Sequence, residues 1–297
     1  MTTPDNNGMV LTSIETFFNN LLQRLFPVWY AAQASREITL HPIGILNPNS
    51  YLSHRWLSLH SVFRSLSESL QAQSSQEPAG SNWQPLCELL DKLITEREFR
   101  RSLSISAIDG IENSSEEEDW PNLQSWAEHS AAGVEHSTAE DFDRCIHQAF
   151  PEEEKPHRIV YREWDGRYYW QNKGDVTSFA AAVLYIHETQ RDANISALIN
   201  VESINTKVLD RLRNDYWLLL LKRESAYPVH DLMVRAGLPV ALAEFEWRRS
   251  DLVFMVARKN DRRVNRILLS LMNNRSTQQI LEFGSWLNRR HFPFRNQ

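Results

Sequence analysis

The chain has 297 residues, of which 42% are hydrophobic, and a formal net charge of −6. This composition is enough for a large core in one or two domains, and no apolar run reaches the length of a membrane-spanning helix. The first residues lack the basic segment of a signal peptide, and Cys87 and Cys145 lie far apart in the sequence. We therefore expect a cytoplasmic protein with no disulfide framework and no membrane partner.

Residues 1–108 are predicted to form a helical N-terminal region. Thr12 and Glu15 have the spacing of a capping box, and apolar residues recur at helical intervals from Ile14 to Phe26. Pro27 then bends or ends the helix. The apolar stripe either packs on its own domain or forms a docking interface for another protein or a second copy. The interface would consist of Phe17, Phe18, Leu21 and Leu25.

Two more helices are predicted in this region. From about Tyr51 to Gln71, leucine and aromatic residues follow the alternating four- and three-residue spacing of a helix pair. From Gln84 to Arg100, apolar residues again recur at helical intervals. A polar segment with Pro and Gly separates the two helices and is predicted to be a loop.

Charge is unevenly distributed along the chain. Residues 109–154 contain 14 acidic residues and one basic residue, a net charge of −13, and we expect residues 109–156 to form an acidic connecting segment. Residues 205–297 contain 17 basic and 9 acidic residues, a net charge of +8. Three interpretations remain open: the regions face solvent or each other, the basic region binds nucleic acid, or the acidic segment imitates a nucleic-acid surface or masks the basic region. A basic face would consist of Arg248, Arg249, Arg258, Arg262, Arg263 and Arg266.

Residues 158–204 are predicted to form two strands, a helix and a third strand. The β-branched and aromatic residues at 159–161 and 167–170 flank Asp165 and Gly166, a strong hairpin signal. Asp175 or Thr177 can cap the apolar helix that follows. Residues 195–204 alternate between apolar and polar side chains, which is typical of a half-buried strand.

The segment RYYWQNKGDVTSFAAAVLY, followed by ISALINVES, resembles the core of the ParB/sulfiredoxin superfamily. In that family a glycine-rich turn with a basic pair leads into an alanine-rich helix, and the turn and helix N-terminus bind nucleotide phosphates. Here Thr177 and Ser178 stand in place of the basic pair, Val176 lies on or near the position of sulfiredoxin's catalytic cysteine, and only Gly174 is clearly retained. The resemblance implies a bacterial or phage-like protein with this core, and the departures predict absent or weak nucleotide binding.

The same turn is nevertheless the candidate phosphate site of the chain. Its residues would be Gly174, Asp175, Thr177 and Ser178, with a remote arginine such as Arg162 or Arg167. No Walker A, GxGxxG, GxSxG or HExxH motif is present, so we assign no catalytic residue and expect no metal or cofactor.

The last third is predicted to alternate helices and strands. Residues 206–215 begin a helix, 216–221 form a strand or a helix end, 230–236 a short helix, and 251–257 a strand. Asn260 or Asp261 caps a helix through Asn273, and Ser276 or Thr277 opens a last helix to Arg289.

Together these elements predict an α+β protein, with a helical part at 1–108, the acidic segment at 109–156 and a mixed-sheet α/β domain with a ParB/sulfiredoxin-like core at 157–297. The leading functional interpretation is a non-enzymatic, cytoplasmic binding protein that contacts another protein or itself. A nucleotide-dependent enzyme or switch that uses the turn at 174–178 is one alternative. A nucleic-acid-binding protein that uses residues 205–297 is the other.

Overall fold

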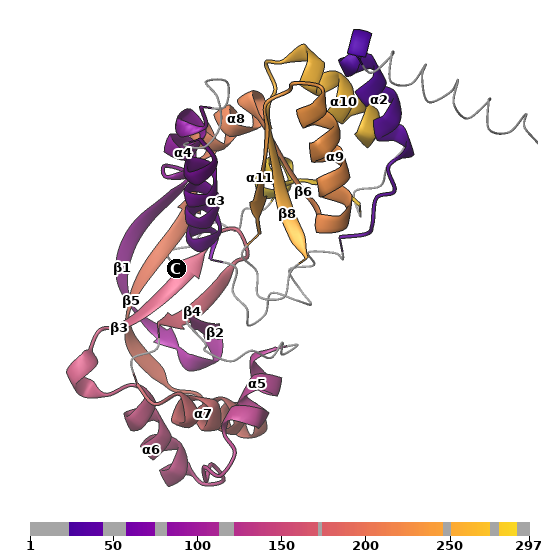
Figure 1. Ribbon diagram of the computed structural model, residues 1–297. Coiled ribbons are helices and arrows are strands. Elements are labelled where there is room, and N and C mark those ends of the chain that lie inside the picture. The colour runs from indigo at the N-terminus through magenta and orange to yellow at the C-terminus, as the bar shows by residue number, and fades with distance from the viewer. Residues whose placement is uncertain are drawn as a thin grey trace, which may run out of the picture.

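The computed structural model describes residues 24–43, 58–74, 82–112, 122–171, 174–245, 251–273 and 279–289. In these residues the chain forms two β-sheets, each packed with helices (Figure 1). Sheet A contains β1 (Ile94–Ser104), β2 (Ile108–Glu112), β3 (His157–Arg162), β4 (Arg167–Gln171) and β5 (Asn194–Ile204). Sheet B contains β6 (Tyr216–Lys222), β7 (Val240–Glu244), β8 (Leu252–Arg258) and β9 (Leu281–Glu282). This combination of helices and sheets confirms the predicted α+β class.

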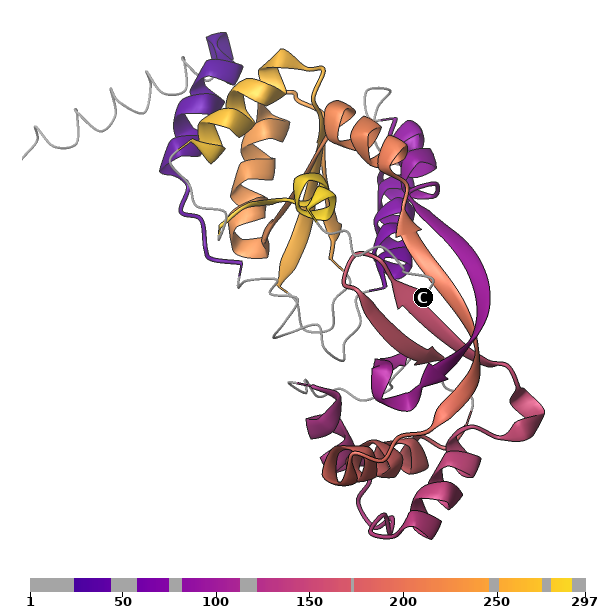
Figure 2. The ribbon, with the colours of Figure 1, turned by 180° about the vertical axis from the view of Figure 1, so that it is seen from behind.

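Sheet A has the strand order β1-β5-β3-β4-β2 and mixes parallel with antiparallel pairs. Helices α5 (Leu123–Ser130), α6 (Ala139–Ala149) and α7 (Val176–Thr189) lie together on one face, as both views show (Figures 1 and 2). Two short 3-10 turns, η1 (Ile105–Ala107) and η2 (Glu152–Glu154), lie in the connections. Alternate residues of β5, from Ile195 to Val201, belong to the core under these helices. The intervening polar residues therefore face the other way.

Sheet B is antiparallel with the order β7-β8-β6-β9 and is covered on both faces. On one face lie α9 (Arg223–Arg235) and α10 (Arg262–Met272), with α2 (Pro27–Glu37) packed on them. On the other face lie α3 (Leu59–Ser74), α4 (Gln84–Leu90), α8 (Thr206–Asp215) and α11 (Phe283–Asn288). Double coverage explains the unbroken apolar runs of β6 and β8, because both sides of these strands are buried. No helix among the described residues is long and apolar enough to cross a membrane.

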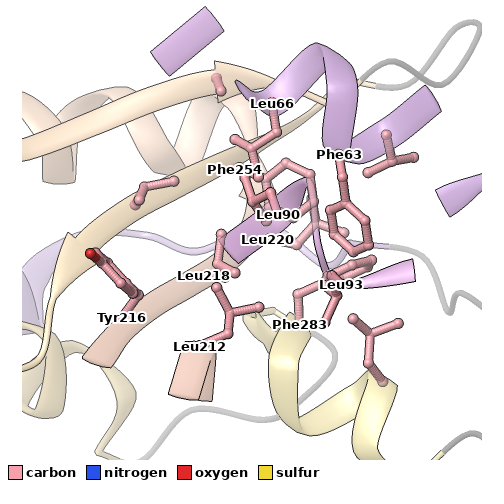
Figure 3. Close-up of a cluster of buried hydrophobic side chains, with 14 of the residues drawn as sticks. Phe63, Leu66, Leu90, Leu93, Leu212, Tyr216, Leu218, Leu220, Phe254 and Phe283 are labelled. Carbon is pink, nitrogen blue, oxygen red and sulfur yellow. The ribbon is translucent and has the colours of Figure 1, made fainter. Parts of the chain in front are cut away.

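Helix α3 lies where the two sheets meet. Its side chains Phe63 and Leu66 pack with Leu220 and Phe254 of sheet B (Figure 3). Trp164, in the turn between β3 and β4, belongs to the same buried cluster. The helix and this hairpin turn thus connect sheet A to the core of sheet B.

The prediction of one helix from Gln84 to Arg100 is wrong beyond Leu90. Helix α4 ends there, and from Ile94 the chain forms β1, which pairs along its whole length with β5. Glutamate and arginine at positions 96–101 favour a helix in isolation, but pairing with a neighbouring strand overrides that preference.

The predicted division at residues 108 and 156 does not follow the two sheets. Strands from all three predicted regions form sheet A, and the acidic segment supplies α5 and α6 to its core. Trp126 of α5 contacts Phe179, and Phe142 of α6 stacks on Tyr185 of α7. The acidic segment is therefore an integral part of the sheet A core rather than only a connection.

Several predicted elements have the expected bounds, and others shift. Helix α8 and strands β5 and β8 are confirmed. Of the alternatives left open, Asp175 and Asp261 are the caps, and residues 216–222 form a strand. The helix expected at 230–236 begins earlier, at Arg223. The last helix, α11, begins only at Phe283 because Glu282 caps it, while Ser276 and Thr277 lie outside the described residues.

Candidate functional site

The face of sheet A opposite α5, α6 and α7 is polar. Its residues come from five strands whose registers place Glu96 beside Glu202, Glu98 beside Asn200, and Glu112 beside Gln171. Arg158 and Arg162 of β3 lie on the same face, because they alternate with the buried Ile159 and Tyr161.

The start of α3 stands over this polar face and forms one wall of an open cavity of about 390 Å³, which we call the polar cavity. The sheet contributes Glu96, Glu98, Glu112, Arg158, Gln171, Leu198, Asn200 and Glu202, and the chain at the start of α3 contributes Ser58, His60, Ser61 and Arg64. The volume lies within the usual range of small-molecule sites. Charges of both signs line it, so it suits a polar ligand.

A buried ion-pair network forms the floor of the polar cavity. Arg162 is fully buried, and its Nε and Nη2 atoms donate to Glu202 Oε2 at 3.2 Å and to Glu112 Oε1 at 2.9 Å. Its guanidinium lies over the Tyr169 ring, 4.5 Å from the centroid. Gln171 Nε2 donates to the other Glu112 oxygen at 2.6 Å. These contacts hold the carboxylates of Glu112 and Glu202 in place.

Glu202 is the most perturbed carboxyl group of this site. Burial raises the pKa of Glu202 to about 7, since the attraction of Arg162 is outweighed by desolvation together with the like charges of Glu112 and Glu96. A carboxyl group with this pKa exchanges its proton near neutral pH. Perturbed groups in a cavity are typical of functional sites.

A histidine and two carboxylates meet at one side of the polar cavity. His60 Nε2 lies 2.9 Å from Glu96 Oε1, and Asn200 Nδ2 donates to Glu96 Oε2 at 3.0 Å. One ligand atom each of His60, Glu96 and Glu202 lies within 4.8 Å of the other two. Imidazole nitrogen and carboxylate oxygen are ligands that Zn²⁺ and Mn²⁺ accept. The arrangement can therefore hold a divalent cation.

The predicted phosphate turn has a different role in the structure. The Asp175 side chain accepts from Thr177 N at 3.1 Å and from Ser178 Oγ at 2.6 Å, so a carboxylate already occupies the N-terminus of α7. Burial opposes ionisation, yet the hydrogen bonds from Ser178 and Thr177 hold the pKa of Asp175 below its ordinary value. An anion would be repelled here. Gly174 lies against the carbonyl oxygen of Ala149, which is a packing contact.

The two arginines expected near that turn lie at the other end of the hairpin. Arg162 and Arg167 are paired across β3 and β4, next to the turn at Asp165, whereas Gly174 follows the far end of β4. Four residues of strand separate these ends by about 13 Å. The structure therefore does not bring Arg162 or Arg167 to the turn at 174–178.

The predicted basic face is not gathered at one place. Arg258, at the end of β8, donates to the Asn82 carbonyl, and Arg263 pairs with Asp261 at 2.8 Å. Arg262 and Arg266 are exposed on α10. Arg248 and Arg249 lie outside the described residues, as do Phe17, Phe18 and Leu21 of the predicted interface. Leu25 is described and is 61% exposed.

Sequence reasoning missed His60, Glu96, Glu112 and Glu202. They come from segments far apart in the chain and form no motif, and Glu96 fell in a stretch predicted to be helical. The one available signal was the polar set of β5, in which Asn200 and Glu202 alternate with buried residues. That alternation predicts that one face of the strand carries polar groups, but it does not predict which element covers that face.

A family model described as "Family of unknown function (DUF6685)" matches residues 98–296. The matched range contains Glu98, Glu112, Arg158 and Glu202, whereas His60, Arg64 and Glu96 precede it. No curated protein and no solved structure matches the chain.

Proposed function

The chain belongs to DUF6685, a family of unknown function, and we propose from the geometry of the polar cavity that it is a binding protein that holds a divalent cation there. The ligands are His60, Glu96 and Glu202. The observation that carries the proposal is the convergence of their three ligand atoms inside a cavity.

Electrostatics supports a cation at this place. Glu96, Glu98, Glu112 and Glu202 line one cavity, and Arg162 beneath it pairs with only two of them. Glu202 is 4% exposed, so water screens its charge poorly. A divalent cation would offset this repulsion and favour the ionised form of Glu202.

The cation proposal is tested by calorimetric titration of Mn²⁺ and Zn²⁺ into the chelator-treated full chain at pH 7.5. We expect one saturable site, with affinity at least about tenfold lower in Glu202→Gln and in His60→Ala, because each loses one ligand. Glu98→Gln is the matched control, since Glu98 lines the cavity without belonging to the triad. Absence of binding, or equal affinity in all three variants, would overturn the proposal.

The pH dependence adds a second readout from the same titration. A cation must displace the proton of Glu202, so affinity is expected to change by less than about twofold between pH 8 and pH 7 and to fall about fivefold between pH 7 and pH 6. Without the raised pKa, the carboxylate would stay ionised down to its ordinary value of 4.5. Constant affinity from pH 8 to pH 6 would argue against Glu202 as a ligand.

The alternatives from sequence have less support. For nucleotide binding at 174–178, the Asp175 carboxylate at the start of α7 is unfavourable. The ParB/sulfiredoxin-like core remains a proposal about ancestry, supported by the order β3, β4, α7, β5. Interaction with another protein or a second copy is the second candidate function, favoured by the exposure of Leu25, Phe26 and Trp29.

A further inference from the structure

We propose that the polar cavity, once it holds its cation, binds a small molecule through a phosphate group placed between the cation, Arg64 and Arg158. This inference rests on the proposed function and adds the ligand class. It is argued from the residues that line the polar cavity but are not ligands of the cation.

The cation site is incomplete by itself. His60, Glu96 and Glu202 provide three ligand atoms, whereas Zn²⁺ and Mn²⁺ take four or more ligands. The site opens into a space of about 390 Å³, enough for roughly a dozen water molecules at about 30 Å³ each. An oxygen-rich ligand of moderate size can therefore complete the coordination.

Two arginines reach the same cavity from opposite walls. Arg64 comes from α3 and Arg158 from β3, and both are exposed. Neither makes an ion pair or hydrogen bond with another described residue, although four glutamates line the cavity with them. Their guanidinium groups are thus available, and guanidinium binds phosphate oxygens in a paired geometry.

The start of α3 adds to the attraction for an anion. Ser58 and Ser61 line the cavity at the N-terminal end of this 16-residue helix, where the helix dipole is positive. The glutamates oppose this attraction when no cation is present. Phosphate binding should therefore require the cation, which distinguishes this site from a simple basic patch.

Phenyl phosphate is the probe, followed by ³¹P NMR with Mn²⁺ and the full chain. With Mn²⁺ kept below the protein concentration so that little of it is free, the phosphate resonance should broaden because the phosphate lies beside the paramagnetic ion, whereas protein with Mg²⁺ should cause no such broadening. Arg64→Gln and Arg158→Gln should each weaken phosphate binding about 10- to 100-fold, the usual effect of losing a charge-assisted hydrogen bond. Their Mn²⁺ affinity should not fall, because neither arginine is a ligand of the cation and each repels it.

Arg100→Gln is the matched control, because Arg100 lies on β1 on the same face of sheet A but does not line the cavity. This inference is overturned if the wild-type chain binds Mn²⁺ but no phosphate, or if both arginine variants bind phosphate as well as the wild type does. Either outcome leaves the cation proposal intact. Phosphate binding without any cation overturns the cation dependence. Absence of Mn²⁺ binding overturns both proposals.

Discussion

At the residue scale, Gly174 has a packing role, although the sequence suggested it as part of a phosphate site. A Cβ atom added there would lie 2.1 Å from the carbonyl oxygen of Ala149, so only glycine lets the chain pass the end of α6. We expect Gly174→Ala to lower the free energy of unfolding by about 1–3 kcal/mol, as other overpacking substitutions do. Urea denaturation measures the difference.

Gly133→Asn is the control for this substitution. No atom lies within 4 Å of a Cβ atom at Gly133, so a side chain there meets only the backbone strain of its positive φ of 86°, which asparagine bears better than most residues. We expect this variant to lose less stability than Gly174→Ala does. If Gly174→Ala lost no more than Gly133→Asn, the close contact with Ala149 would not be the reason for glycine at that position.

Individual residues differ in how well the sequence predicts them. The sequence left each cap open between two residues, Asp175 or Thr177 and Asn260 or Asp261, and in the structure the aspartates are the caps, because each carboxylate accepts from an N–H two residues further along. The environment of Glu202 depends on Arg162, Glu112 and Glu96, which are 40 or more positions away. Only the strand registers bring them together, so no local pattern could predict this site.

At the scale of elements, the hairpin of β3 and β4 inserts Trp164 into the cluster that α3 shares with sheet B. Trp164 is 3% exposed. We expect Trp164→Ala to lower the free energy of unfolding by about 3–5 kcal/mol, the usual cost of removing a buried tryptophan. Trp164→Phe keeps an aromatic ring there and should cost less than half as much.

Urea denaturation followed by circular dichroism measures both Trp164 variants. If alanine and phenylalanine had the same small effect, the hairpin turn would not contribute to the connection between the sheets. A broadened or two-step transition in Trp164→Ala alone would show that the two sheets unfold separately once this contact is removed.

Elements were predictable where one periodicity dominates. Strand β5 alternates strictly, and β8 is apolar throughout, so both were predicted with nearly correct bounds. Strand β1 was missed because its exposed residues are charged on both faces and only Phe99 and Leu103 indicate the buried side. Such a strand depends on its partner β5 rather than on its own sequence.

At the scale of the whole molecule, the start of the described chain carries an exposed apolar group. Leu25, Phe26 and Trp29 are 61%, 58% and 47% exposed, beside the α2 contact with α9 and α10. If this group mediates self-association, a triple substitution to glutamine should change the sedimentation coefficient from that of a dimer to that of a monomer, with little change in Tm.

Val234→Gln is the control for the triple variant, because Val234 is 50% exposed on α9 but its sequence neighbours are the buried Met233 and the charged Arg235. We expect it to sediment as the wild type does. A wild-type chain that is monomeric at micromolar concentrations would contradict self-association and leave only a different protein as the partner.

The position of α3 has a mechanical consequence. Phe63, Leu66 and Leu70 fasten the helix to sheet B, while His60 and Arg64 extend from its first turns over sheet A. A ligand that bridges His60 and Glu202 would therefore join α3, and with it sheet B, to sheet A. Ligand binding and the packing of α3 over sheet A would then be thermodynamically linked, so that a change favouring one favours the other by the same factor.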